Sequence, residues 1–336
     1  MAPGLLSLAV SLGDPAGIGP EIVCASYKRL RGEDATRPFF VVGGAQVLRA
    51  AAEAIGLDCP VEHIAAPEEA TVIFATALPV LGADDSDYIP GIPRDDGARL
   101  ALHSLIETTR LAREGEAAGI VTAPVAKAQL VRAGFEFPGQ TEYLADACGL
   151  DAQDAVMMLA GPSLRTVPLT IHVALADVSR LLTTDLIVHR AKIVAKALRR
   201  DFGIDRPRLA VAGFNPHAGE GGQFGDEEAQ VIEPAIAALR AEGFDVIGPV
   251  PGDALFTPRM RPTYDVALCA YHDQALIPLK ALDFDEGVNV TLGLPIVRTS
   301  PDHGTAFDIA GKGIADPSAM CAAIRMASAM ATARSR

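Results

Sequence analysis

The stretch RLAVAGFNPHAGEGGQFGDEEAQVIEPAIAALRAEGFDVIGPV, residues 208–250, contains three local patterns in succession. The apolar runs at 208–214 and 245–250 predict strands, and the amphipathic segment 226–243 between them predicts a helix. Two strands joined by a helix form a βαβ unit, in which the strands are parallel. This stretch therefore predicts an α/β fold.

The same alternation continues along the chain. Other apolar runs predict strands at residues 5–13, 38–44, 118–125, 154–161, 165–173, 265–272 and 288–297. Other amphipathic segments predict helices at residues 45–56, 97–116, 183–203 and 316–334. Because many strand runs are apolar at nearly every position, we expect a largely parallel sheet that helices cover on both faces.

The chain has 336 residues, a length typical of about two domains. Its 49% hydrophobic and 21% charged residues predict a sizeable core and no large disordered region. The sequence has no low-complexity linker and no internal repeat that would mark a boundary. We therefore expect domains between which the chain passes more than once.

The net charge of −13 argues against nucleic acid or an anionic membrane as the main partner, although a small phosphorylated substrate remains compatible with it. No apolar run approaches the roughly 20 residues of a membrane span. The N-terminal residues 1–17 lack a basic region, so they predict a buried first strand rather than a signal peptide. Five cysteines without a CxxC pair predict free thiols in a reducing compartment, and we expect the cytoplasm.

Three histidines follow apolar, strand-like runs: His172, His217 and His272. Binding and catalytic groups gather at strand ends in α/β proteins, so these imidazoles are candidates for one divalent-metal site with positions open to substrate. A lone histidine at such a place more often has a structural role.

Two glycine-rich segments are candidate ligand loops. Residues 11–23, SLGDPAGIGPEIV, are either a tight turn that leads into a helix or a loop whose backbone amides contact a ligand. Their glycine spacing differs from the GxGxxG dinucleotide fingerprint. Residues 215–228 combine glycines, amides and His217, which favours a ligand-binding loop whose backbone approaches the ligand closely.

Further polar residues suit an anionic substrate or a nucleotide. Lys280, Asn289 and Arg298 supply two cations and an amide, as a phosphate site requires, although spacing alone does not bring them together. The segment 299–317 either wraps an adenosine or only joins a strand to a helix. The chain contains neither a GxSxG elbow nor a Walker sequence.

Six motifs in order resemble the 4-hydroxythreonine-4-phosphate dehydrogenase family, from about residue 7 to residue 320. They are GDPAGIGPEI (13–22), TAPVAK (122–127), GQTEYLA (139–145), NPHAGEGGQFGDEE (215–228), YHDQALIPLK (271–280) and VNVTLGLPIVRTSPDHGTAFDIAGKG (288–313). Both ends also resemble the wider isocitrate/isopropylmalate dehydrogenase superfamily, which binds its nicotinamide cofactor without a Rossmann fingerprint. The resemblance implies two α/β/α domains with a cleft between them, expected at residues 1–135 plus 290–336 and at residues 136–289. The second would hold the metal histidines and the dimer contacts.

The resemblance also implies residue roles. The family's metal ligands fall on His172, His217 and His272, at an interface between the two subunits of a homodimer. Its substrate contacts fall on Gln140, Thr141, Lys280, Asn289 and Arg298, where Gln140 replaces the family's usual histidine. The adenosine half of NAD would lie at the loop of His303, Gly304, Thr305, Ala306 and Asp308. Asp253 and Lys280 are the candidate catalytic groups.

The implied reaction oxidises the C3 hydroxyl of 4-phosphooxy-L-threonine with NAD, or alternatively NADP. Loss of CO2 then gives 3-amino-2-oxopropyl phosphate, a precursor of pyridoxal phosphate. A divalent metal, namely zinc, magnesium, manganese or cobalt, would act as the Lewis acid.

Three alternatives stay open. A related dehydrogenase would act on 4-phospho-threonate or erythronate, or on an aromatic dihydrodiol dicarboxylate. A metabolite sensor would need no turnover, and an acyl transfer to phosphate would need no metal histidines.

Overall fold

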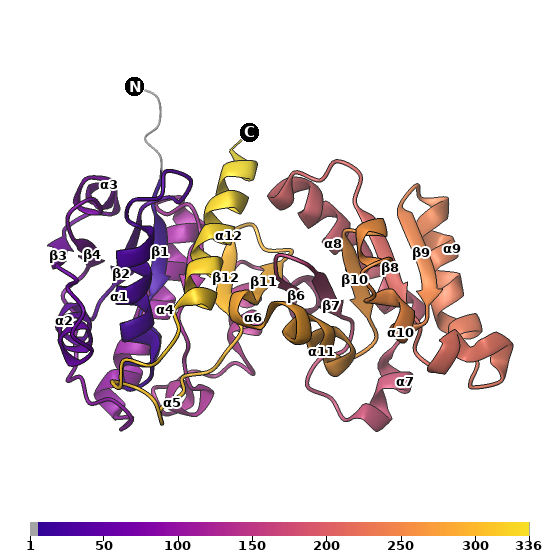
Figure 1. Ribbon diagram of the computed structural model, residues 1–336, viewed down its shortest axis with the longest axis horizontal. Coiled ribbons are helices and arrows are strands. Elements are labelled where there is room, and N and C mark those ends of the chain that lie inside the picture. Colours follow the sequence, from indigo (N-terminus) through magenta and orange to yellow (C-terminus); the bar gives the residue numbers. More distant parts are fainter. Residues whose placement is uncertain (1–5, 336) are drawn as a thin grey trace. The chain divides into compact units, whose positions relative to one another are not determined.

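The computed structural model describes residues 6–335, which fold into two compact units (Figure 1). The first unit runs to Ala152 and resumes at Leu294, and the second comprises Gln153–Gly293. The boundaries expected at 135/136 and 289/290 lie elsewhere, because α6 (Gln140–Ala147) packs in the first unit. There Tyr143 contacts the rings of Phe135 and Phe137, with centroids 5.7 and 5.4 Å apart.

The first unit contains a parallel sheet of strand order β3-β4-β2-β1-β5-β12. Its strands are β1 (Leu8–Ser11), β2 (Phe39–Val42), β3 (Val61–Ile64), β4 (Leu78–Leu81), β5 (Ile120–Thr122) and β12 (Arg298–Pro301). Its helices are α1 (Gly19–Leu30), α2 (Ala45–Ala54), α3 (Ala70–Ile73), α4 (Asp95–Glu114), α5 (Lys127–Arg132), α6 and α12 (Ser318–Arg334). Helix α1 packs against α2 and α12, whereas α4 packs against α5 and the central strands. Figure 1 shows the N-terminal strands, in indigo, close to α12, in yellow.

The second unit contains a mixed sheet of strand order β11-β6-β7-β10-β8-β9. Its strands are β6 (Val156–Ala160), β7 (Arg165–Pro168), β8 (Arg208–Ala212), β9 (Asp245–Val250), β10 (Val266–Cys269) and β11 (Val288–Leu292). Its helices are α7 (Val178–Leu181), α8 (Thr184–Phe202), α9 (Glu233–Ala241), α10 (Gly252–Leu255) and α11 (His272–Asp283). β6 pairs antiparallel with β11 and with β7, and the other pairings are parallel. The strands are therefore largely parallel, as expected, and the pairings of β6 are the antiparallel exceptions.

The predicted strands and long helices are present, although most are shorter than their apolar runs. Leu5, the first residue of the predicted strand 5–13, lies outside the described residues. The sequence patterns missed β3, β4, β12, α6, α11 and the short helices α3, α5, α7 and α10. β3 is an edge strand with exposed polar residues, β12 reads Arg-Thr-Ser-Pro, and α11 contains Pro278, so these three lack the apolar periodicity that marks an element.

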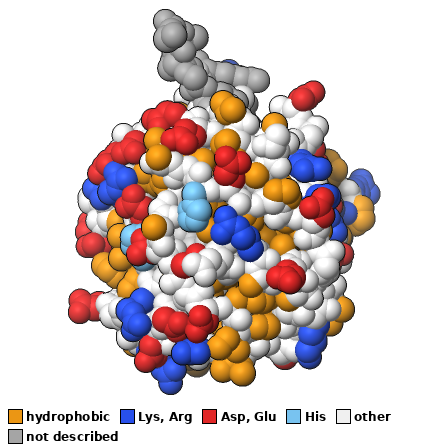
Figure 2. Space-filling view, turned by 90° about the vertical axis from the view of Figure 1, so that its left-hand side faces the viewer, with side chains coloured by type: hydrophobic (Ala, Val, Ile, Leu, Met, Phe, Trp, Pro, Cys, Tyr) orange, Lys and Arg blue, Asp and Glu red, His pale blue; other side chains and the backbone are white. Residues whose placement is uncertain are grey.

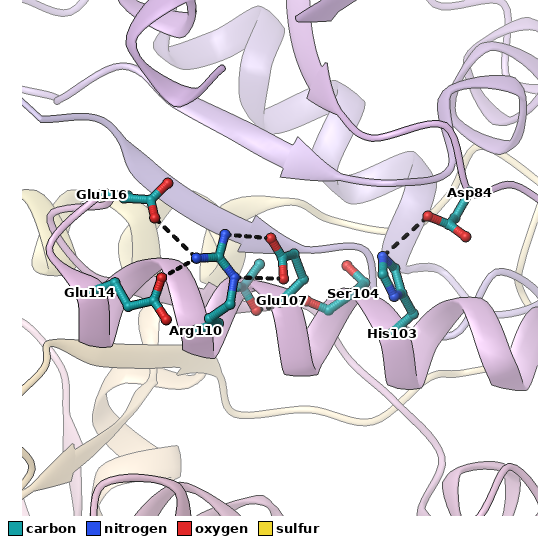
Figure 3. A network of polar contacts seen from close by, with 8 residues as sticks. Asp84, His103, Ser104, Glu107, Arg110, Glu114 and Glu116 are labelled. Carbon is teal, nitrogen blue, oxygen red and sulfur yellow. Dashed lines mark hydrogen bonds and ion pairs between the residues drawn. The ribbon is translucent and has the colours of Figure 1, made fainter. Parts of the chain in front are cut away.

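Helix α4 of the first unit has one side toward the sheet and the other toward solvent (Figure 3). On its buried side, the Ser104 hydroxyl accepts a hydrogen bond from Leu12 N at 2.9 Å and donates one to Val42 O at 2.7 Å. On its exposed side, Arg110 pairs with Glu107, Glu114 and Glu116. Ser104 thus satisfies two backbone groups where β1 and β2 end.

Acidic and basic side chains are interspersed on the face that Figure 2 shows, which therefore carries no continuous basic surface. No helix among the described residues has the length and apolarity needed to cross a bilayer.

Candidate functional site

The three candidate metal histidines follow neighbouring strands of the second unit. β7, β10 and β8 are adjacent and parallel, so their carboxyl ends lie at one edge of the sheet. His172 lies four residues past the end of β7, His272 is the first residue of α11 after β10, and His217 lies in the loop after β8. The predicted placement at strand ends agrees with this arrangement.

His172 and His272 form a pair, with ring centroids 5.7 Å apart. His172 has a φ of +54°, a left-handed conformation that is uncommon outside glycine and is concentrated at functional sites. The Thr170 hydroxyl donates a 2.7 Å hydrogen bond to Ala270 O, which ties the two loops together. The pair lines a pocket of about 340 Å³, whose wall includes Tyr271.

A carboxylate contacts one ring nitrogen of His272. Its Nδ1 lies 2.7 Å from Asp273 Oδ1. In the tautomer in which Nδ1 donates, Nε2 presents a lone pair, as in metal-binding histidines that a carboxylate orients. Asp273 is therefore placed to orient the imidazole of His272.

His217 has the same kind of carboxylate contact but lies apart from the pair. Its Nδ1 is 3.0 Å from Glu220 Oε2, and its ring packs edge-on against Phe224 at 5.8 Å. His217, Ala218 and Glu220 all have left-handed φ values of +53°, +52° and +42°. Among residues 6–335, no group of three or more His, Cys, Asp and Glu side chains is placed to hold a metal ion. One chain therefore brings His172 and His272 together but does not bring His217 to them.

Two side chains that sequence reasoning missed fix the loops around these histidines. The buried carboxylate of Glu228 accepts hydrogen bonds from Phe214 N and Asn215 N. The amide of Gln274 accepts one from Ala270 N at 2.7 Å and donates one to Gly213 O at 2.8 Å. Gln274 thus connects the loop of His272 to the loop of His217. The acidic run at 226–228 was a signal for Glu228, whereas the sequence contains no comparable signal for Gln274.

The other predicted residues of the second unit are scattered. Asp253 is exposed on α10, and α10 packs against the Pro216–Gly222 segment. Lys280 is exposed near the end of α11. Asn289 on β11 donates to Met157 Sδ at 3.3 Å, and its buried Oδ1 has no hydrogen-bond partner among the described residues. Arg298 belongs to the first unit.

Within the first unit, Arg298 contacts Gln140, and the resemblance implies a substrate contact for each of them. Arg298 Nη2 donates to Thr122 Oγ1 at 2.8 Å and to Gln140 Oε1 at 3.1 Å. Burial lowers the pKa of Arg298 to about 10. Gln140 and the half-buried Thr141 begin α6. Thr122, in the TAPVAK motif, was not predicted as a contact of Arg298.

The candidate cofactor loop, residues 303–313, rests on the glycine-rich segment before α1. Ile18 N donates to Thr305 O at 2.9 Å, and a Cβ at Gly17 would lie 2.8 Å from the same oxygen. Glu21, which is buried, accepts a hydrogen bond from Gly311 N at 3.0 Å. Within the loop, His303, Gly304 and Asp308 are exposed, Thr305 is buried and Ala306 has a φ of +42°. Residues 11–23 thus form a turn that leads into α1 and also support the loop 303–313.

Comparison with known proteins covers nearly the whole chain. The family model described as "Pyridoxal phosphate biosynthetic protein PdxA" matches residues 34–327. The chain belongs to the PdxA family. A relative from Erythrobacter litoralis, named 4-hydroxythreonine-4-phosphate dehydrogenase, is 62% identical over 327 residues, which are 97% of each chain. A relative of the same name from Zymomonas mobilis is 55% identical, over 95% of this chain and 94% of its own.

Solved structures agree with this membership of the PdxA family. The crystal structure of 4-hydroxythreonine-4-phosphate dehydrogenase from Klebsiella pneumoniae has a TM-score of 0.86 and 41% identity, covering 97% of this chain and 100% of that one. A terephthalate 1,2-cis-dihydrodiol dehydrogenase from Burkholderia xenovorans has a TM-score of 0.65 and 29% identity, covering 96% and 98%. The predicted family and α/β fold are confirmed, and this PdxA chain is an enzyme, an oxidoreductase.

Proposed function

We propose that this chain oxidises the C3 hydroxyl of 4-phosphooxy-L-threonine with NAD and a divalent metal. Loss of CO2 then gives 3-amino-2-oxopropyl phosphate for pyridoxal phosphate biosynthesis. The names of the relatives support the substrate. The observation that carries the proposal is the His172–His272 pair, with Asp273 on Nδ1 of His272.

The donor set of the second unit fits a divalent metal. His217 and His272 each have a carboxylate at Nδ1, which leaves Nε2 available in the corresponding tautomer. Imidazole ligands suit zinc or cobalt, and the oxygens of a substrate would extend the site to magnesium or manganese. When bound, the metal would supply a Lewis acid for the oxygen at C3.

A homodimer would complete this donor set. The pair of one chain lacks the third histidine, so we propose that His217 of one subunit and the pair of another serve the same site. Exposed apolar side chains beside the pocket, Val173 and Leu175, suit a surface that a second copy covers.

The chain's own polar groups would bind and orient the substrate. A buried guanidinium such as that of Arg298 suits a phosphate, because it presents several donors in one plane. Gln140 and Thr122 hold that guanidinium in place, and Thr141 lies beside Gln140. We retain Lys280 and Asn289 as further substrate contacts. Asp253 and Lys280 are the proposed groups for proton transfer.

The loop 303–313 fits the adenosine half of a nicotinamide dinucleotide. Its exposed carboxylate, Asp308, suits the ribose hydroxyls, and its exposed imidazole, His303, suits a base edge. We propose NAD as the cofactor, with NADP as the alternative. All five cysteines are free thiols, which supports the cytoplasm as the proposed location.

The test is NADH formation from 4-phosphooxy-L-threonine by wild type, His217→Ala and the matched control His103→Ala. His103 is an exposed histidine on α4 that pairs with Asp84 at 3.2 Å, far in sequence from the site. We expect His217→Ala to lose about 10- to 100-fold in metal affinity, most of its activity and little thermal stability. The control should behave as wild type. Near-normal turnover by chelator-treated protein would contradict the metal-dependent mechanism.

A related dehydrogenase activity is the second candidate, because the terephthalate dihydrodiol dehydrogenase shares the fold and Gln140 departs from the family's usual histidine. A panel of 4-phospho-threonate, phospho-erythronate and an aromatic dihydrodiol dicarboxylate separates the two. A higher kcat/KM for any of these than for 4-phosphooxy-L-threonine would replace the first proposal. A protein that binds these acids without forming NADH would instead be a metabolite sensor.

A further inference from the structure

The carboxylate of Glu228 lies beneath the loop that carries His217 and holds its first residues. Glu228 is only 3% exposed. Its Oε1 accepts hydrogen bonds from Phe214 N at 2.8 Å and Asn215 N at 2.7 Å, and its Oε2 accepts one from Asn215 Nδ2 at 2.9 Å. Both oxygens of one buried carboxylate are therefore engaged by Phe214 and Asn215, which follow β8 and Gly213.

The loop itself has little regular structure to hold it. Residues His217 to Gly221 all have positive φ, and three of them are not glycine. Such residues stay in the left-handed region only when their surroundings constrain them. Glu228 also lies close to the centre of the loop, because a Cβ on Gly219 would lie 2.8 Å from Glu228 Oε2. Charge-assisted hydrogen bonds to backbone amides are among the stronger constraints available.

The local backbone of Glu228 is also unusual. Residues Glu228–Ile232 form a π-helical turn ahead of α9. Such turns are rare and occur frequently at functional sites. Glu228, whose carboxylate contacts the loop, is the first residue of this turn.

We infer that Glu228 is a positioning residue, which acts through Phe214 and Asn215 to set the backbone and hence the imidazole of His217. It touches neither substrate nor metal in this role. The consequence for metal binding rests on the proposed function, whereas the consequence for the order of the loop does not.

The experiment compares Glu228→Met, Glu228→Gln and the matched control Glu227→Met. Methionine has a similar length but no strong acceptor, so Phe214 N and Asn215 N lose their partner. Glutamine keeps one oxygen for these two amides. Glu227, the neighbouring residue, has only its contact with Asn215 Nδ2 at 2.7 Å in this loop. The same substitution there removes a negative charge without touching the backbone amides.

Two readouts do not require turnover. Hydrogen exchange of a peptide spanning residues 213–225, in metal-free protein, reports the order of the loop. Competition for Zn²⁺ with a chromophoric chelator reports the metal affinity of the intact protein. We expect Glu228→Met to accelerate exchange of Phe214 and Asn215 by about tenfold or more and to weaken Zn²⁺ binding about 10- to 100-fold. Glu228→Gln should recover most of both losses, and Glu227→Met should stay within about twofold of wild type.

Unchanged exchange and unchanged Zn²⁺ affinity in Glu228→Met would overturn the inference. Equal losses in Glu228→Met and Glu227→Met would also overturn it, because loss of charge would then suffice. If Glu228→Met does not fold, Gly219→Ala perturbs the same contact from the loop side, and wild-type exchange and Zn²⁺ affinity in that variant would overturn the inference. If wild type forms no NADH but the exchange pattern follows the expected order, the positioning role stands and the proposed function fails.

Discussion

Two loops of this molecule, 214–225 in the second unit and 303–313 in the first, each contact a buried glutamate but are held in different ways. Glu228 binds the first loop with both oxygens and three hydrogen bonds. Glu21 binds the second with one hydrogen bond, and its buried Oε1 has no partner among the described residues. Hydrogen bonds to a carboxylate therefore hold the loop 214–225 in place. The loop 303–313 must be held by other contacts as well.

In the loop 303–313 that contribution comes from close backbone packing. Gly17 and Gly91 each lie where a Cβ would approach a loop carbonyl oxygen, at 2.8 Å from Thr305 O and 3.1 Å from Phe307 O. Ile18 N also donates to Thr305 O. A loop held by a carboxylate should be sensitive to loss of an acceptor, whereas a loop held by close packing should be sensitive to an added methyl group.

The largest expected effect is that of Gly17→Ala on the cofactor loop. The new Cβ would lie 2.8 Å from Thr305 O and 3.0 Å from Thr305 Cβ, so the loop must move. If the loop binds NAD as proposed, displacement on the order of 1 Å should lower kcat/KM for NAD by up to about 100-fold. NAD affinity by calorimetry and steady-state kinetics measure this. Gly32→Ala is the matched control, since no atom lies within 4 Å of its new Cβ. Equal NAD affinity in both variants would show that close packing does not hold this loop.

Substitution of Glu21 should have a smaller effect. Glu21→Leu leaves Gly311 N without its acceptor, which should weaken NAD binding about tenfold, whereas Glu21→Gln keeps an oxygen for that amide and should stay near wild type. Ser26→Ala is the control, because Ser26 is a buried residue of the same helix that contacts Cys321 Sγ at 3.4 Å. The KM for the phosphorylated substrate should rise less than the KM for NAD. An equal rise of both would contradict a role of Glu21 confined to the loop 303–313.

Glu21→Gln should also affect the stability of the fold. Burial raises the pKa of Glu21, and the hydrogen bond from Gly311 N opposes that shift only in part. The folded protein therefore disfavours the ionised carboxylate, and this cost disappears as the pH falls through the raised pKa. At neutral pH, Glu21→Gln should thus unfold at a temperature equal to or above that of wild type. A clearly lower unfolding temperature would show that the charge stabilises the fold.

The sequence predicted those elements whose buried residues form an apolar run or an amphipathic pattern. β8 and β9 are apolar and the helical segment between them is amphipathic, so both periodicities were visible. β12 was missed because its burial depends on neighbours from distant parts of the chain. The Arg298 side chain in that strand is buried against Thr122 and Gln140, which no local pattern reveals.

The candidate site shows the same limit. The residue types and their placement after strands predicted the His172–His272 pair, because parallel strands end at a common edge. The roles of Gln274 and Glu228 could not be assigned in this way, even though Glu228 lies in an acidic run, since each acts through hydrogen bonds to backbone groups of another segment. Such contacts depend on tertiary geometry, and the sequence shows only that a polar residue is present.

The smallest expected effect on the cofactor loop is that of Ser104→Ala, which changes neither glutamate nor glycine. The Ser104 hydroxyl, on α4 (Figure 3), accepts a hydrogen bond from Leu12 N and donates one to Val42 O. Leu12 belongs to the glycine-rich segment 11–23 that supports residues 303–313. Loss of the hydroxyl leaves two buried backbone groups without this partner, which should cost about 1–3 kcal/mol of unfolding free energy. NAD affinity should stay within about twofold, because Gly17 and Ile18 keep their own contacts with Thr305. Urea denaturation and NAD titration measure the two quantities. A loss of NAD affinity as large as that of Gly17→Ala would mean that the end of β1, rather than the close approach of Gly17, sets the position of the loop.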